Sequence, residues 1–268
     1  MTFALGPALL FCPADRPERF RGALEKADAV ILDLEDAVLP DAKATARGNL
    51  IDADLDPDRV IVRVNAPGTE AFVSDLSTLS QTDFRTVMVA KTEDPAALSA
   101  FDERFDLIAL CETARGVHFA DRIAAHPRIV AIMWGAEDLV ASLGGTASRT
   151  ADGVYRDVAR YSRSRVLIEA GAHGKAAIDA VHIAIDDTDG LRREAEDASA
   201  SGFAATACIH PSQVGVIRAA YAPAEETVSW ARDVLAAAAT ERGVFRFRGR
   251  MIDEPVLRHA RSVLDRAH

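Results

Sequence analysis

The sequence predicts an α/β protein that folds as a (β/α)8 TIM barrel and carries a C-terminal helical extension. Short apolar runs of four to six residues recur eight times along the 268-residue chain. They show little polar alternation, which is typical of parallel strands covered on both faces. Stretches with helical patterning separate them, and eight such units in about 220 residues favour a closed barrel over an open doubly wound sheet.

The predicted strands share this apolar and often β-branched composition. In chain order they are Ala8–Cys12, Ala29–Leu34, Val60–Val64, Thr86–Val89, Leu107–Cys111, Ile129–Trp134, Ala180–Ile183 and Ala205–Ile209. The predicted helices fill the intervals between them. They are Pro17–Lys26, Asp41–Ile51, Pro95–Phe105, Arg115–Ala125, Asp152–Ala172, Asp189–Ser201 and Pro211–Ala220.

Two local features support these helices. Asp15 stands where the N-cap of the first helix is expected. In the longest helix, Val154, Val158, Tyr161 and Val166 form an apolar stripe at helical spacing.

The rhythm changes after Tyr221. Ala224–Thr240 and Pro255–Ala267 are predicted helices, and a short strand bounded by Gly243 and Gly249 lies between them. This tail does not fit the barrel repeat. We therefore expect a catalytic barrel domain over residues 1–220 and a helical extension over 221–268, which acts as a lid or an oligomer arm.

Composition excludes several classes of function. The chain has 31 basic and 41 acidic residues, a net charge of −10, which argues against binding to a nucleic-acid backbone. Aromatic residues are only 6%, too few for a base-stacking platform. Three widely spaced cysteines indicate a reducing compartment. We find neither a run of about 20 apolar residues nor a basic segment before the first apolar run, so we expect a cytoplasmic protein without membrane contact.

Charged residues stand at the ends of the predicted strands. In a barrel, catalytic groups come from the carboxyl ends of the strands and the loops after them. Charges at a buried barrel mouth are costly unless they are paired or bound to a metal. The residues that fall there are Asp15, Arg16, Asp33, Glu35, Asp36, Arg63, Asn65, Lys91, Glu112, Glu137, Asp138 and His210.

Glu112 and the Glu137-Asp138 pair indicate a site for a hard cation. Mg²⁺ takes one or two carboxylates and leaves its other positions to water and substrate. The alternative is that Glu112 pairs with Arg63 or Arg115, while Asp138 caps a turn. No zinc-like spacing of His, Cys and Asp occurs in the sequence.

The basic residues leave two readings open. Arg63 lies in an apolar strand, so it either pairs internally or reaches a substrate oxyanion. Arg16, Arg19 and Lys43 either hold an anionic group such as a phosphate or are solvated. Locally, Asp253 fits an N-cap of the last helix.

Seven short motifs, taken together and in order, resemble the citrate lyase β-subunit-like branch of the HpcH/HpaI aldolase family. Each is weak alone, but together they span residues 10 to about 260. They are Phe11-Cys-Pro-Ala-Asp-Arg16-Pro-Glu-Arg19-Phe, Leu32-Asp-Leu-Glu35-Asp36-Ala-Val, Arg63-Val-Asn65, Leu110-Cys-Glu112-Thr-Ala, Trp134-Gly-Ala136-Glu137-Asp138-Leu, Ile209-His-Pro-Ser-Gln213 and Met251-Ile-Asp253-Glu-Pro.

The resemblance implies a Mg²⁺-dependent carbon–carbon lyase on a TIM barrel, often trimeric. It assigns Glu112 and Asp138 as metal ligands and Arg63 as the group that stabilises the developing oxyanion. Asp253, from a neighbouring subunit, would be the acid/base group.

It also implies a binding surface for an acyl-CoA thioester. The substrate side would include Glu112 and Arg63 together with Arg16, Lys43, Glu35, Asp36, Ala136 and Glu137, with Arg16 and Lys43 towards the CoA phosphates. Glu137 would also shape its loop.

The implied reaction is retro-Claisen cleavage of a citramalyl-, malyl-, citryl- or hydroxymethylglutaryl-type thioester. The products are acetyl-CoA or propionyl-CoA and a keto acid. A hydroxyacyl-CoA thioesterase and a carrier-protein-dependent citrate lyase subunit remain as alternatives.

Overall fold

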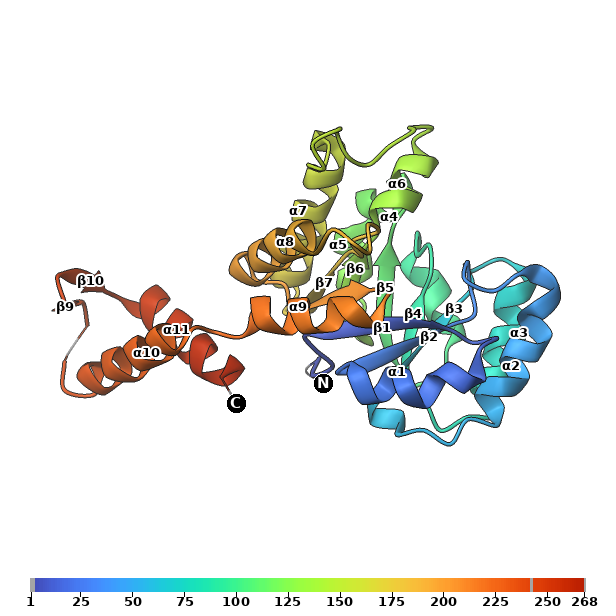
Figure 1. Ribbon diagram of the computed structural model, residues 1–268, viewed down its shortest axis with the longest axis horizontal. Coiled ribbons are helices and arrows are strands. Elements are labelled where there is room, and N and C mark those ends of the chain that lie inside the picture. Colours follow the sequence, from blue (N-terminus) through green and yellow to red (C-terminus); the bar gives the residue numbers. More distant parts are fainter. Residues whose placement is uncertain (1–2, 242, 268) are drawn as a thin grey trace. The chain divides into compact units, whose positions relative to one another are not determined.

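Eight parallel strands close into a barrel in the computed structural model, which describes residues 3–241 and 243–267 (Figure 1). Each strand pairs with its neighbours in sequence order, and β1 pairs with β8. The strands are β1 (Ala8–Pro13), β2 (Ala29–Asp33), β3 (Val60–Val64), β4 (Thr86–Val89), β5 (Asp106–Cys111), β6 (Ile129–Trp134), β7 (Ala176–Asp179) and β8 (Ala205–Cys208). The predicted TIM barrel is confirmed.

The barrel interior is filled by alternate residues of the strands. Leu9 pairs in register with Ala29, and Ile31 pairs with Ile61, so that inward-facing side chains meet in layers. The buried interior cluster consists of Leu9, Ala29, Ile31, Ile61, Met88, Ile108, Leu110, Ala131, Met133, Ile178, Ala205 and Ala207. The strands are buried on both faces, which explains their continuous apolar runs.

Helices follow the strands around the barrel. The α-helices are α1 (Phe20–Lys26), α2 (Lys43–Ile51), α3 (Glu70–Leu79), α4 (Ala114–His118), α5 (Ala120–Ala124), α6 (Ala136–Ser142), α7 (Asp157–Ala172), α8 (Thr188–Ser201) and α9 (Pro211–Tyr221). Four single-turn or short 3-10 helices lie between them, at Pro17–Arg19, Pro40–Ala42, Pro57–Arg59 and Pro95–Ala100.

The predicted position of the seventh strand was wrong. The strand is Ala176–Asp179 and not Ala180–Ile183. Gly174, at φ +64°, ends α7, and the Lys175 amide donates to the Ala170 carbonyl, so the chain enters the sheet directly after this turn. The apolar run that follows the strand belongs to the loop at the barrel mouth.

Several of the helix predictions were wrong, including Arg115–Ala125, which is two helices, and Asp152–Ala172, which begins only at Asp157. Pro95–Phe105 forms only a 3-10 helix over Pro95–Ala100, and α3 and α6 were not predicted. Asp15 does not cap the first helix, because Arg16 is the residue that precedes the 3-10 turn.

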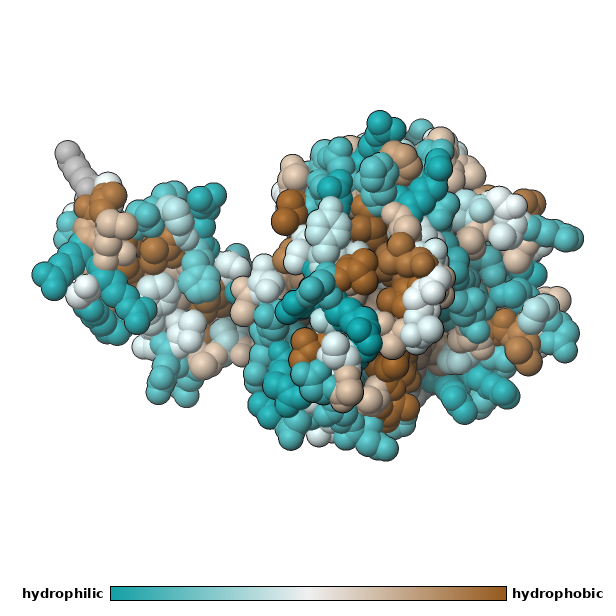
Figure 2. Space-filling model, turned by 90° about the horizontal axis from the view of Figure 1, so that it is seen from above, coloured by the Kyte–Doolittle hydropathy of each residue, from teal (hydrophilic) through white to brown (hydrophobic). Residues whose placement is uncertain are grey.

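The apolar stripe predicted for the longest helix is not its buried face. Val158 and Tyr161 are 43% and 61% exposed, and Val154 precedes α7. The buried face is made of Ala159, Ser162, Val166 and Ala170. Three of these side chains are small, which lets α7 pack closely on β6 and β7. Figure 2 shows separate hydrophobic patches within a mostly hydrophilic surface.

The tail is a compact unit of its own. The first unit ends at Ile217 and the second begins at Arg218. Beyond α9, the second unit contains α10 (Glu225–Ala238), β9 (Phe245–Phe247), β10 (Arg250–Ile252) and α11 (Glu254–Arg266) around a core of Val228, Ala231, Val234, Ile252, Ala260 and Val263.

The single strand predicted in the tail is an antiparallel hairpin. Arg248 and Gly249 form its turn, and both have positive φ, as a two-residue hairpin loop requires. Among the residues that the structure describes, no helix is both long and apolar enough to cross a membrane.

Candidate active site

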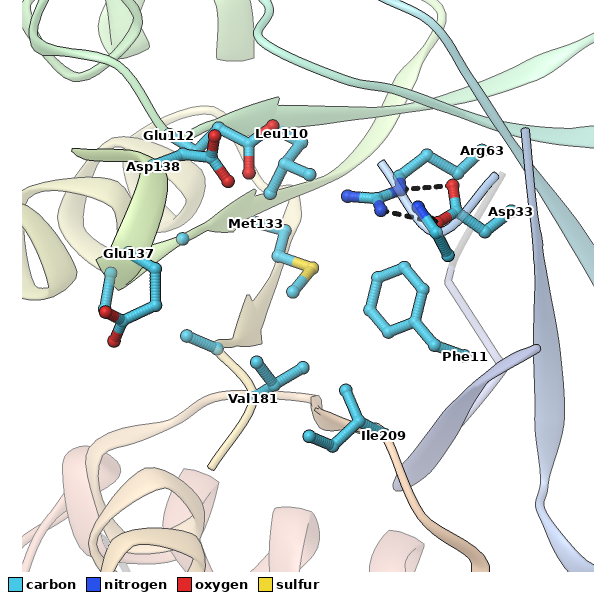
Figure 3. A pocket seen from close by; sticks show the side chains of 14 residues that line it. Phe11, Asp33, Arg63, Leu110, Glu112, Met133, Glu137, Asp138, Val181 and Ile209 are labelled. Atoms are coloured by element: carbon cyan, nitrogen blue, oxygen red, sulfur yellow. Dashed lines mark hydrogen bonds and ion pairs between the residues drawn. The ribbon is translucent and has the colours of Figure 1, made fainter. Parts of the chain in front are cut away.

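A pocket of about 190 Å³ opens at the carboxyl ends of the barrel strands (Figure 3). Glu112 and Asp138 lie together on one side of it, and Arg63 and Asp33 lie on the other. The lining residues are Phe11, Asp33, Ala37, Arg63, Leu110, Glu112, Met133, Gly135, Ala136, Glu137, Asp138, Ala180, Val181 and Ile209. The pocket thus places two carboxylates opposite a guanidinium, with apolar side chains between them.

Glu112 directly follows β5 and is almost completely buried, at 3% exposure. Its Oε1 atom accepts a hydrogen bond of 3.1 Å from the Lys91 amide. Burial, and next the neighbouring charge of Asp138, raise the pKa of Glu112 to about 8. Ionised Glu112 therefore needs a nearby cation.

Asp138 supplies the second carboxylate from the first turn of α6, which begins after Gly135. The two acids come from neighbouring strands, because β5 pairs with β6. Gly135 permits this approach, since a Cβ atom there would lie 2.8 Å from Glu112 Oε2 and 2.9 Å from its Cβ. The sequence between β6 and α6 is therefore fitted to the Glu112 side chain.

This donor set fits a hard divalent cation. Both donors are carboxylates, which suit Mg²⁺, and open pocket volume remains for water and substrate oxygens. Within the described part of the chain, no group of three or more His, Cys, Asp or Glu side chains is arranged to hold a metal ion. The geometry therefore matches a magnesium site completed by substrate, and not a closed structural site.

Arg63 is held by Asp33 in a two-point ion pair. Arg63 Nε donates to Asp33 Oδ1 at 2.7 Å, and Nη2 donates to Oδ2 at 2.6 Å. Asp33 is fully buried and also accepts from the Glu35 and Ala37 amides. The Phe11 ring lies 4.8 Å from the guanidinium carbon. The guanidinium is thus fixed in one orientation.

Arg63 also keeps donors for a ligand. Its Nη1 atom lies 3.3 Å from Glu35 Oε2, and the residue lines the pocket. A guanidinium carries five N–H donors, more than these contacts use. Of the two readings that the sequence left open, the structure shows the internal pair, and the remaining donors leave the substrate contact available.

Lys91 links the acidic groups on the two sides of the pocket. Its ammonium bonds Glu35, contacts Asp36 Oδ2 at 3.0 Å, and lies 3.4 Å from Asp138 Oδ1. Glu35 is buried, whereas the side chain of Asp36 is 63% exposed. Sequence reasoning placed Lys91 at a strand end but gave it no role.

Lys43 is bound within the framework of the β2 loop. Its ammonium donates to the carbonyls of Leu34 and Glu35 at 2.8 and 2.9 Å, and to Asn65 Oδ1 at 2.7 Å. These three acceptors match the three donors of an ammonium group. Asn65 in turn donates to the fully buried Asp75 of α3 at 2.7 Å. Asp75 has no counterpart among the predicted site residues, because it falls in a helix that was not predicted.

The remaining predicted residues fall in different places. Ala136 and Glu137 line the pocket, and Glu137 Oε1 accepts from Ser148 Oγ at 2.6 Å. Arg16 is outside the pocket lining, with 57% of its side chain exposed. Asp253 belongs to the second unit and caps α11, where its Oδ1 accepts from the Val256 amide at 3.3 Å.

The chain matches one family model and several well-covered relatives. The model of the HpcH/HpaI aldolase/citrate lyase family matches residues 8–211. A citrate lyase subunit beta-like protein of Mycobacterium tuberculosis is 55% identical over 98% of this chain and 96% of its own. The mitochondrial citramalyl-CoA lyase of Mus musculus is 31% identical over 96% of this chain and 84% of its own.

Solved structures resemble this chain in both fold and sequence. The structure of protein CitE from Mycobacterium tuberculosis in complex with magnesium, acetoacetate and coenzyme A superimposes with a TM-score of 0.93, at 55% identity and 98% coverage of both chains. A citrate lyase beta subunit from the same organism, complexed with oxaloacetate and magnesium, gives a TM-score of 0.80 at 55% identity, covering 82% of this chain and 98% of that one.

Proposed function

The chain belongs to the HpcH/HpaI aldolase/citrate lyase family, and we propose that it is a Mg²⁺-dependent carbon–carbon lyase acting on a β-hydroxyacyl-CoA thioester. The single observation that carries this proposal is the pair of carboxylates, Glu112 and Asp138, facing Arg63 across one pocket. The ligands of its relatives support it, since CitE has been solved with magnesium, acetoacetate and coenzyme A.

Glu112 and Asp138 hold the metal in this proposal. Bound there, Mg²⁺ supplies Lewis-acid polarisation of the oxygens on the keto-acid half of the substrate. The two carboxylates fix where that half lies, and the apolar residues Leu110, Met133 and Val181 restrict the access of water. Glu112 thereby has both a binding and a catalytic role.

The chemical step is a retro-Claisen cleavage. A base removes the proton of the β-hydroxyl, the new carbonyl of the keto acid forms, and the carbon–carbon bond breaks. Its electron pair passes onto the thioester as an enolate, which takes up a proton at carbon to give acetyl-CoA or propionyl-CoA. Arg63 donates hydrogen bonds to the oxygen on which negative charge develops, and a donor of this kind contributes about 10²–10³ to the rate.

Asp253 supplies the proton transfer at the acetyl carbon, a role that we take from the family resemblance. It lies in the second unit, and we propose that it serves the barrel of a neighbouring subunit in a homotrimer. Arg16 contributes to binding the anionic CoA half. Glu35, Asp36, Ala136 and Glu137 belong to the substrate-binding side of the mouth. Lys43, with its three internal acceptors, shapes the loop that carries Glu35. We expect the enzyme in the cytoplasm.

A thioesterase is the second candidate. The (3S)-malyl-CoA thioesterase of Cereibacter sphaeroides KD131 is 33% identical over 97% of this chain and 94% of its own. The same site would then activate water against the thioester carbonyl, giving free CoA and the free hydroxy acid. A subunit that acts on a carrier-protein thioester is the third candidate, supported by the resemblance to citrate lyase beta subunits.

One experiment separates the three candidates. Purified protein is incubated with citramalyl-, malyl-, citryl- and hydroxymethylglutaryl-CoA, and separately with a citryl thioester of acyl carrier protein, in Mg²⁺ or in EDTA, and the products are identified by mass. Acetyl-CoA with a keto acid supports the lyase. Free CoA without acetyl-CoA identifies a thioesterase. Turnover only of a thioester on acyl carrier protein identifies the third function.

A further inference from the structure

Lys91 has a backbone conformation that is uncommon for its residue type. Its φ is +48°, and Lys91 and Arg248 are the only non-glycine residues with positive φ in the described ranges. A side chain is disfavoured in this region, where glycine is accommodated easily. A lysine that persists there is expected to have a side chain that the site uses.

Both ends of Lys91 contact the acidic site. The amide donates to Glu112 Oε1 at 3.1 Å, and the ammonium lies 3.4 Å from Asp138 Oδ1. The same ammonium bonds Glu35, which lies 3.3 Å from Arg63 Nη1. One residue thus contacts both carboxylates that face the pocket and the acid that adjoins the guanidinium.

The left-handed conformation explains how one residue makes these contacts. The turn after β4 directs the amide towards β5 and the side chain across the mouth to α6 and the loop after β2. Since the Lys91 side chain is only 28% exposed and its ammonium meets three carboxylates, it has little freedom to move.

We propose that Lys91 is a positioning residue that holds the metal-binding carboxylates and the Glu35–Arg63 pair in one geometry. This inference rests on the proposed function, in which Glu112 and Asp138 bind Mg²⁺. Partners that orient metal ligands from outside contribute about 10- to 100-fold to metal affinity. The ammonium is such a partner for Asp138, and the amide is one for Glu112.

The proposal predicts the sign of a charge-removal experiment. If Lys91 were only a positive charge near the site, its removal would leave the carboxylates more negative, and a divalent cation would bind more tightly. If Lys91 orients the ligands, its removal weakens binding although the site becomes more negative. The two roles therefore predict opposite changes in the same quantity.

The test measures Mn²⁺ binding to the full-length protein without substrate, by electron paramagnetic resonance. The variants are Lys91→Gly, which relieves the backbone conformation and keeps the amide, and Lys91→Met, which keeps the stem. Lys26→Met removes the charge of an exposed lysine in the last turn of α1 and serves as the control. Thermal unfolding shows whether each variant is folded.

We expect Mn²⁺ affinity to fall about 10-fold or more in both Lys91 variants and to stay unchanged in Lys26→Met. Unchanged or tighter binding by folded Lys91→Gly would overturn the positioning role while leaving the proposed function intact. Because substrate completes the site, wild-type protein that binds Mn²⁺ neither alone nor in the presence of acetoacetate would overturn the proposed function, and this inference with it. Lys91→Met removes the ammonium but keeps a side chain at the positive φ, whereas Lys91→Gly also changes the backbone preference. A loss of affinity in both variants therefore cannot come from the backbone alone.

Discussion

The Glu112 carboxylate lies against Gly135 so closely that no side chain fits between them. A Cβ atom at Gly135 would lie 2.8 Å from Glu112 Oε2, a separation that real Cβ atoms essentially never show. The φ of Gly135 is −132°, which any residue adopts, so the requirement is one of space and not of backbone conformation. A glycine at position 135 therefore leaves the space that Glu112, the proposed metal ligand, occupies.

Gly135→Ala is expected to displace Glu112 and to weaken Mn²⁺ binding and turnover together, by about 10-fold or more. Isothermal titration and steady-state kinetics measure the two effects. Gly48→Ala is the matched control, because its Cβ would meet nothing within 4 Å and alanine favours a helix. Equal metal binding by Gly135→Ala and wild type would show that the close approach has no role in the site.

Asp33→Asn should reduce both stability and kcat. It removes the buried charge that pairs with Arg63 at two points, and breaking a buried pair costs about 3–5 kcal/mol. The freed guanidinium can then move, so kcat should fall about 100-fold, the effect of losing one oriented donor. Urea unfolding and kinetics test this, with the exposed Asp58→Asn as control. A wild-type kcat in Asp33→Asn would show that Asp33 is not needed to position Arg63.

Glu112→Gln should stabilise the metal-free protein at alkaline pH. The pKa of Glu112 is raised from 4.5 to about 8, so the folded state retains a proton that the unfolded state has already released. This group contributes stability that is lost as the pH rises from about 4.5 to about 8. Glutamine does not titrate and can still accept from the Lys91 amide.

The difference in Tm between Glu112→Gln and wild type should therefore grow between pH 5 and pH 8, by at least about 3 °C, and then level off. Differential scanning calorimetry in EDTA measures it. Adding Mg²⁺ should reduce the difference, because the metal stabilises the ionised wild-type carboxylate. A Tm difference independent of pH would place the pKa of Glu112 near its ordinary value.

Asp75→Asn should destabilise the protein, because Asp75 lies outside the pocket and holds Asn65, which in turn holds Lys43 against the loop after β2. Asp75 is fully buried and accepts from the Asn65 amide and side chain at 2.9 and 2.7 Å and from Arg47 Nε at 2.8 Å. Removing its charge leaves Arg47 without its charged partner and should cost about 3 kcal/mol. Denaturant unfolding measures the loss, and Asp75→Glu should recover less than half of it, because an added methylene at a fully buried position must displace its neighbours. Full stability of Asp75→Asn would contradict the network.

The barrel was predictable because its strands are continuous apolar runs. The bounds of Val60–Val64, Thr86–Val89 and Ile129–Trp134 agree with the structure. The seventh strand was misplaced because Asp179 divides two short apolar runs, 176–178 and 180–183, and the second run, which contains Val181 and Ile183, belongs to the loop. Helix α3 was missed since its buried face includes Asp75 and Thr78, which interrupt the apolar pattern.

The site was predictable only in outline. Strand ends in a barrel meet at one mouth, so Arg63, Glu112 and Asp138 could be expected near one another. The contacts of Lys91 depend on a positive φ at a lysine, which residue preferences argue against. The Asp75 network depends on helix α3. That helix was not predicted, because Asp75 itself interrupts the apolar pattern of its buried face. Such features follow from the fold and not from local sequence.

The stoichiometry of cleavage tests the central claim most directly. With the thioester that turns over fastest, keto acid, acetyl- or propionyl-CoA and consumed substrate are measured together, in Mg²⁺ and in EDTA, for wild type and Asp138→Asn. The account predicts one keto acid and one shortened acyl-CoA for each thioester consumed, with loss of turnover in EDTA and in Asp138→Asn. Equal turnover in EDTA, or consumption of thioester without keto acid, would contradict a metal-dependent carbon–carbon lyase.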